Sequence, residues 1–258
     1  GFSTSRTMGH RAVDGEPVPG TFAAEDELFG IGQALADTGC GVFELANAVT
    51  GGEVTGDGID DALKEIEWMH RLSAKIERPV SFALLQFDSR PDLWRELLSI
   101  CEKTRKDGAQ VVAQFAARPF GILAGHQTEA NPFLNRPAYL EIAELPLAER
   151  AARLRDPSVR ARILGPERDA EGSGFAALLD VPGILWRIFP LGDPPDYEPP
   201  REASIAGIAE REGRPSEEVL YDHMLRDDAR ELLLLPFFNY SNGDLEPMRE
   251  MIDHPDTV

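Results

Sequence analysis

Polar side chains gather at the carboxyl ends of four segments that have the pattern of β-strands. Each segment is apolar at its start and polar at its end, and the polar residues are Ser5 and Arg6, Glu44 and Asn47, Gln86 and Asp88, and Gln114 and Arg118. Hydroxyl, amide and guanidinium groups can bind a substrate, and a carboxylate can also bind a metal ion. If the strands run parallel, their ends meet on one rim, so the spacing predicts a shared site there. The alternative is that strand ends are polar only because they lie near solvent.

Arg6 is the residue that we expect to contact the substrate most directly. A guanidinium group at such a rim offers a planar fork that matches a carboxylate. Arg118 is a candidate for the same role. An Arg6 that forms only a salt bridge within the protein remains the alternative, and Ser5, Asn47 and Gln86 complete the expected substrate-binding set.

Two of the five histidines, His10 and His126, stand in loops that follow predicted strand ends. That is the functional side of a parallel barrel, and we expect His126 to contact substrate or metal. His70, His223 and His254 stand within or at the end of predicted helices. For these three we expect structural or solvent-exposed roles.

The first part of the chain alternates predicted strands with predicted helices. We predict strands over 1–7, 41–47, 79–87 and 109–117, and helices over 23–38, 59–76 and 92–106. Strands that are connected through helices pair in parallel. No glycine-rich phosphate turn follows any of these strands, which weakens a dinucleotide-binding interpretation. The polar strand ends favour an α/β fold of the (β/α)8 TIM-type barrel class.

The pattern predicts three parts. Residues 1–118 form the first βα units of the barrel, 119–183 form an insertion that resembles a lid, and 184–258 form later barrel strands and helices. Because the chain begins and ends within predicted strands, we expect a partial barrel that lacks strands at both ends. The chain would then be an internal fragment of a longer enzyme.

The later elements are less regular than the first ones. We predict a helix over 147–155, a strand over 184–189, two short helices with N-caps at Ser204 and Ser216, a strand or helix over 230–238, a helix over 244–253 and the start of a strand over 256–258. Ser is a preferred N-cap because its side-chain oxygen accepts a hydrogen bond from the first helical turn.

Composition limits the class of partner. The formal net charge of −19 argues against nucleic acid or an anionic membrane as a partner. Cys40 and Cys101 form no metal or redox motif, and Cys101 lies on the apolar side of a predicted helix. No segment has the 18 or so consecutive apolar residues of a membrane-spanning helix, and we expect a cytoplasmic protein with a small-molecule partner. The oligomeric state stays open.

Four stretches carry a family resemblance. They are GFSTSRT with VPGTFAAEDEL near the start, PVSFALLQF in the third predicted strand, and SIAGIAEREGRPSEEVLYDHML and LEPMREMIDHPDTV towards the end. Together they resemble the N-acyl-D-amino-acid deacylases (D-aminoacylases) of the amidohydrolase 3 type, within the amidohydrolase superfamily. The likeness covers nearly the whole chain in short, scattered motifs. It implies a metal-dependent barrel hydrolase.

The resemblance also implies one or two zinc ions, which activate a water molecule and polarise the scissile carbonyl. The first His-x-His ligands and the catalytic Asp of that family have no counterpart here, so we expect no catalytic residue in this chain. Two further ligand histidines would stand at the ends of the second and third strands, where this chain has Ala46 and Leu84. Glu44 is the residue that we expect to bind zinc in their place. A buried, hydrogen-bonded carboxylate is the alternative.

The expected function is therefore hydrolysis of a C–N (amide) bond in a small molecule of the N-acyl-D-amino-acid type by metal-activated water. Two other functions stay open. The missing histidines fit a metal-free paralogue that acts as a binding or scaffold protein. A metal-free lyase or isomerase with Glu44 as its base is the third possibility.

Overall fold

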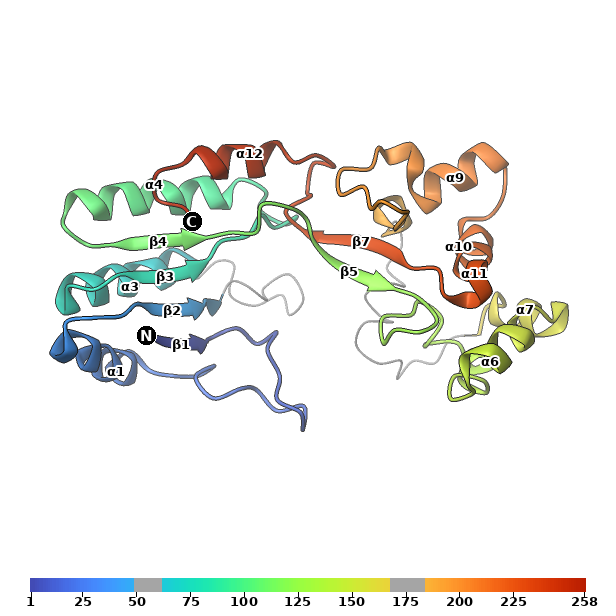
Figure 1. Cartoon of the computed structure of the whole chain (residues 1–258), viewed down its shortest axis with the longest axis horizontal. Helices are drawn as coiled ribbons and strands as arrows, with labels where there is room; N and C mark the ends of the chain where they lie inside the picture. The colour runs from blue at the N-terminus through green and yellow to red at the C-terminus, as the bar shows by residue number, and fades with distance from the viewer. Residues whose placement is uncertain (49–61, 168–183) are drawn as a thin grey trace. The chain divides into compact units, whose positions relative to one another are not determined.

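The computed structural model describes residues 1–48, 62–167 and 184–258, which form two compact units (Figure 1). The first unit comprises Gly1–Arg118 and Phe238–Val258, and the second comprises Pro119–Phe237. This division differs from the expected one. Residues 184–237 belong with the insertion that follows Arg118, and only the last 21 residues (238–258) return to the first unit. Part of the expected insertion, 168–183, lies outside the described residues.

The first unit contains a parallel sheet whose strands follow one another in chain order. The strands are β1 (Phe2–Ser5), β2 (Phe43–Ala46), β3 (Val80–Ala83) and β4 (Val111–Gln114). All four predicted strands are confirmed, although each is shorter than predicted. Thr257 forms a further parallel bridge with Ala113, so the predicted strand start over 256–258 extends the sheet beyond β4. The chain is therefore an α/β protein with a parallel sheet whose strands lie in the same order as in the sequence.

Helices cover the sheet on one side. They are α1 (Glu25–Thr38), α3 (Ala62–Ile76) and α4 (Leu93–Lys106), and α12 (Glu246–Asp253) follows in the returning segment. Neighbouring helices α1 and α3, and α3 and α4, pack against each other. α1 ends at Gly39, whose φ of 64° is the left-handed conformation that glycine adopts without strain. The predicted helices are confirmed, except that 59–61 lie outside the described residues.

Alternation along the strands separates two faces of this sheet. One face, the helix face, is apolar and buried, and its residues are Phe43, Leu45, Val80, Phe82, Val111 and Ala113. The ring of Phe43 lies 6.5 Å from that of Trp68 in α3, which shows that α3 covers this face. The opposite face, which we call the polar face, consists of Ser3, Ser5, Glu44, Ala46, Ser81, Ala83, Val112 and Gln114. The apolar strand residues thus hold the sheet to its helices and leave hydroxyl, carboxylate and amide groups on the other side.

The second unit has its own sheet and its own core. The sheet has the order β5 (Phe120–Ala124), β7 (Leu233–Phe238) and β6 (Phe189–Pro190), with β6 antiparallel to β7. The helices are α5 (Pro137–Leu140), α6 (Leu147–Leu154), α7 (Pro157–Ile163), α9 (Ile205–Glu212), α10 (Ser216–Met224) and α11 (Arg226–Ala229), with short 3-10 turns η2 (Ile184–Arg187) and η3 (Arg201–Ala203). Phe133, Tyr139 and Tyr221 lie in its core.

Four expectations for this unit can be compared with the structure. The strand predicted over 184–189 is wrong for Ile184–Arg187, which forms the turn η2 against α9 with its apolar side chains only partly buried, and only Phe189 of that range belongs to a strand, β6. The N-cap at Ser204 is confirmed, since its side chain accepts a bond from the Gly207 amide at 3.1 Å. The N-cap at Ser216 is wrong by one residue, because α10 begins at Ser216 and Pro215 precedes it. The apolar segment over 230–238 contains a strand, β7.

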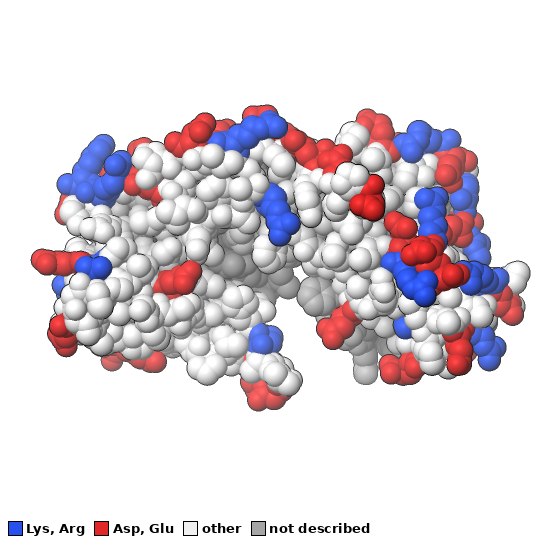
Figure 2. All heavy atoms as spheres, viewed as in Figure 1, with Lys and Arg blue, Asp and Glu red and all other residues white. Residues whose placement is uncertain are grey.

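Acidic and basic side chains are interleaved on the face of the second unit drawn in Figure 2. Ion pairs also connect helices and loops of this unit, for example Arg160 with Glu218 at 3.0 Å and Arg214 with Glu212 at 2.9 Å. Among the described residues, no helix is both long enough and apolar enough to cross a bilayer.

Candidate functional site

A pocket of about 750 Å³ runs along β1 and reaches the polar face of the sheet. Ser5, Glu44 and Gln114 line it from the polar face, and His10 lines it from the loop after β1. This loop can close over β1 because Gly20 has no side chain. A Cβ atom at Gly20 would overlap the Thr4 side chain, and the φ of 98° also favours glycine.

Ser5 and His10 form a hydrogen-bonded pair in this pocket that can transfer a proton. Ser5 Oγ lies 2.8 Å from His10 Nδ1, and the pair is exposed. Two tautomers satisfy this distance. When Nδ1 carries the proton and donates to Ser5, Nε2 can accept a proton from water or substrate. The sequence predicts both residues on the functional side of the sheet but does not predict their contact.

Glu44 lies on the polar face with serine on either side. In the strand register it stands beside Ser3 of β1 and Ser81 of β3. Among residues 1–48, 62–167 and 184–258, no group of three or more His, Cys, Asp or Glu side chains is placed to hold a metal ion. The described residues therefore do not form a zinc site around Glu44.

Gln114 lies on the same face but not next to Ser5. Their strands, β1 and β4, are three strand spacings apart, or about 14 Å. One small molecule can reach both only if it extends across β2 and β3. Ser5 and Glu44 lie on adjacent strands, two register positions apart, and both line the pocket.

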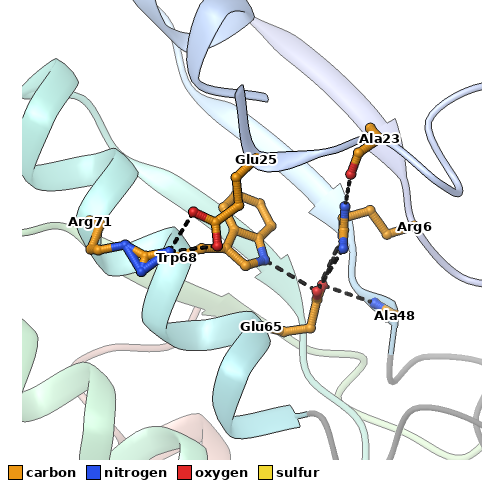
Figure 3. A network of polar contacts seen from close by, with 7 residues as sticks. All are labelled: Arg6, Ala23, Glu25, Ala48, Glu65, Trp68 and Arg71. Atoms are coloured by element: carbon orange, nitrogen blue, oxygen red, sulfur yellow. Dashed lines mark hydrogen bonds and ion pairs between the residues drawn. The ribbon is translucent and has the colours of Figure 1, made fainter. Parts of the chain in front are cut away.

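Arg6 points to the helix face, where it pairs with Glu65 of α3 (Figure 3). Arg6 Nε lies 3.1 and 3.2 Å from the two carboxylate oxygens of Glu65, and Arg6 Nη2 lies 3.0 Å from Oε1. Arg6 Nη1 donates to the carbonyl of Ala23. Glu65 also accepts from Trp68 Nε1 at 3.2 Å and from the Ala48 amide at 3.3 Å.

This network changes the interpretation of Arg6. Each of its three guanidinium nitrogens has a partner within the chain, and the group lies 5.5 Å from the centre of the Trp68 ring. The fork that we expected to bind a substrate carboxylate instead binds Glu65. The structure therefore favours the salt-bridge alternative for Arg6.

Asn47 and Gln86 are also buried rather than presented at an open rim. Asn47 is 4% exposed and its Nδ2 donates to the carbonyl of Ala83 at 3.4 Å. Gln86 is 1% exposed, and its side chain bonds the carbonyl of Pro91 and the amide of Ser241. Both side chains fix the backbone at strand ends, which is a structural role.

Asn239 joins the carboxyl ends of β3 and β4, and sequence analysis missed it. Its Oδ1 accepts from the Gln86 amide at 2.8 Å, and its Nδ2 donates to the carbonyls of Ala116 and Arg118 at 3.2 and 3.4 Å. The residue is fully buried and has a φ of 62°. Asn is one of the few residues that adopt this left-handed conformation, and the FNYSNG segment gave that signal.

His126 lies in the second unit, apart from the residues that line the pocket along β1. It is 1% exposed and stacks on Tyr139, with ring centres 5.7 Å apart and an interplanar angle of 17°. Its Nδ1 lies 3.1 Å from Tyr139 Oη. Burial, together with the charge of Arg150, lowers the pKa of His126 to about 3, and burial raises the pKa of Tyr139. His126 is therefore a neutral ring within a polar cluster of its own.

The structure thus brings Ser5, Glu44 and His10 together, assigns structural contacts to Arg6, Asn47 and Gln86, and places Arg118 at the end of the first segment of unit 1. Comparison with known proteins adds no assignment. No family model, no curated protein and no solved structure matches this chain.

Proposed function

We propose that the first unit is part of a barrel-type enzyme that hydrolyses a C–N bond of a small molecule at its polar face. Sheet topology supports the barrel. Strands in the order β1-β2-β3-β4 with helices packed side by side on one face can curl until the other face becomes the interior. A doubly wound sheet reverses its strand order and carries helices on both faces, and the described residues have neither feature.

One observation carries the chemical part of the proposal, namely the Ser5–His10 hydrogen bond inside a pocket that also contains Glu44. In the proposed reaction, His10 Nε2 takes a proton from a water molecule as that water attacks the carbonyl carbon. His10 then returns the proton to the nitrogen as the C–N bond breaks, so that a carboxylic acid and an amine leave. Ser5 holds the imidazole in position, and Glu44 stabilises its cationic form. General acid–base groups of this kind contribute about 10²- to 10⁴-fold to a rate.

We assign no step of the proposed hydrolysis to a zinc ion. Activation of water by a metal ion needs several protein ligands, and Glu44 has only serine beside it in the register. A zinc-dependent reaction at this face would therefore need ligands beyond the described residues.

The test is hydrolysis of a panel of N-acyl amino acids of both hands and simple amides, with and without added zinc or a chelator. We expect release of free amine by the wild-type protein, and a loss of about 100-fold in kcat for His10→Asn. His70→Asn, in α3, is the matched control and should leave kcat unchanged. Equal rates for wild type and His10→Asn would reject the role of His10, and no hydrolysis across the panel would reject the function.

The same panel distinguishes the two rival functions. A binding or scaffold protein would bind members of the panel without releasing amine. A lyase or isomerase with Glu44 as its base would convert a substrate without consuming water, and Glu44→Gln would abolish the reaction whereas His10→Asn would not. Glu44 on the polar face, on the strand next to Ser5, is the observation that keeps this last candidate open.

A further inference from the structure

The second unit contains a polar cluster whose hydrogen positions follow from its geometry. Tyr139 Oη lies 2.7 Å from Asn131 Nδ2 and 3.3 Å from Arg150 Nη1, and both of these groups can only donate. The Phe133 amide donates to Asn131 Oδ1 at 2.9 Å, which fixes the orientation of the Asn131 amide. Tyr139 Oη therefore accepts from two donors, and its own proton remains for His126 Nδ1 at 3.1 Å. His126 must then carry its proton on Nε2.

Two N–H groups of this cluster are left over. His126 Nε2 and Arg150 Nε are buried, and within the described residues neither has a hydrogen-bond partner. Stacking on Tyr139 and on Phe133 holds the His126 ring and prevents it from turning to another acceptor. Proteins rarely bury a donor without an acceptor, because the lost hydration is not replaced. The missing acceptor is an oxygen that the described residues do not supply.

The same residues line a pocket of about 500 Å³. His126, Asn131, Tyr139 and Arg150 form its polar wall, and Glu129 and Glu144 also line it. We propose that this pocket is a binding site for a small monocarboxylate, whose oxygens accept from Arg150 and, once the lining side chains shift, from His126 Nε2, which has almost no exposed surface in the structure. The positive charge of Arg150 favours an anion there. The two glutamates disfavour a dianion such as phosphate, because like charges repel in a confined site.

This site does not depend on the proposed hydrolysis, since all of its residues lie in the second unit. The probes are acetate, glycine and inorganic phosphate, titrated against the 258-residue chain and followed by calorimetry and by the His126 ring Nε2–H signal in nitrogen-edited NMR. We expect acetate or glycine to bind and to shift the Nε2–H signal, and phosphate to bind at least tenfold more weakly.

Three variants give the specific test. His126→Phe keeps the aromatic stack but removes the donor, and Arg150→Gln removes the charge and Nε–H. Each should weaken carboxylate binding at least tenfold. Arg153→Gln, on the same helix and exposed, should bind as the wild type does. Unchanged binding in both site variants, or tighter binding of phosphate than of either carboxylate, would overturn the proposal.

The proposed carboxylate site can still be tested if a variant fails to fold. In the wild-type chain, the NMR signal of His126 reports on the site directly. If neither carboxylate moves that signal, the proposal is wrong whatever the variants do.

Discussion

The imidazole of His126 packs against the rings of Phe133 and Tyr139 and is 1% exposed, so folding removes it from water. Its pKa falls from 6.5 to about 3. In the unfolded chain the same group takes up a proton near pH 6.5, whereas in the folded chain it stays neutral. Acid therefore favours the unfolded chain, and the contribution of His126 to stability is complete above pH 6.5 and is lost as the pH falls towards 3.

The direction of this pH dependence gives a prediction for a single residue. Between pH 7 and pH 4.5, the free energy of unfolding of the wild type should fall by about 2 to 3 kcal/mol more than that of His126→Gln, at about 1.4 kcal/mol per pH unit for one proton. Urea unfolding at a series of pH values measures the difference. Equal slopes for wild type and His126→Gln would show that His126 is not buried neutral.

Strand alternation separates the expected site residues into two groups. Ser5 and Glu44 lie on the polar face, whereas Arg6 and Asn47, one and three residues further along, turn to the helix face and are held by Glu65 and Ala83. The sequence contained this information, because Phe2 and Thr4 share the parity of Arg6. It could not reveal Glu65 as the partner, since that contact spans 59 residues. Nor could it reveal the Ser5–His10 distance, which depends on the path of a loop.

At the scale of elements, the Arg6–Glu65 pair fastens the end of β1 to α3. The Glu65 side chain is 8% exposed and Arg6 19%, so neutralising Glu65 leaves a partly buried cation without its partner. Glu65→Gln should lower the free energy of unfolding by about 2 to 3 kcal/mol, somewhat less than for a fully buried pair. Chemical denaturation of the purified variant measures this loss.

Figure 3 also contains the matched control for that prediction. Glu25 and Arg71 form an ion pair at 2.5 Å, but their side chains are 57% and 52% exposed. Glu25→Gln should therefore change the free energy of unfolding by no more than about 0.5 kcal/mol. If Glu25→Gln lowered the free energy of unfolding as much as Glu65→Gln does, burial would not explain the contribution of the Arg6–Glu65 pair to stability.

Asn239 gives a second prediction at this scale, because it ties the ends of β3 and β4 to the returning segment. Asn239→Ala should cost about 3 kcal/mol, since it removes buried hydrogen bonds and places alanine at a φ of 62°. Asn239→Gly should cost less, because glycine tolerates that φ. Asn242→Ala, exposed and three residues on, should be neutral in thermal unfolding. A neutral Asn239→Ala would show that the strand ends do not need this bridge.

Regular elements of the first unit could be predicted because apolar periodicity there matches the strands and helices that form. The elements of the second unit are harder to predict from the sequence, for a physical reason. Ile184–Arg187 has the apolar composition of a strand, yet it forms a 3-10 turn whose apolar side chains are only partly buried, against α9. β5 follows Pro119 directly and contains Gly121, whose close approach to Leu234 and Leu235 of β7 only the fold reveals.

At the scale of the whole molecule, one unit is inserted into the sequence of another. The chain leaves the parallel sheet after β4, builds the second unit over 119–237 and returns to pair Thr257 beside Ala113. The sequence showed where regularity stops but not which apolar segments share a core. An apolar segment such as β7 fits either core by composition, so the boundary expected at residue 183 lies instead at Phe237.

The polar face of the sheet is the central claim, and Glu44 lies at its centre between Ser3 and Ser81. The measurement that tests it most directly is kcat/KM on the best substrate of the amide panel for Glu44→Gln and for Glu67→Gln, an exposed carboxylate of α3. We predict a loss of at least about tenfold for Glu44→Gln, from removal of one charge-assisted contact, and no change for Glu67→Gln. A Glu44→Gln protein as active as the wild type would place the chemistry elsewhere and contradict the claim.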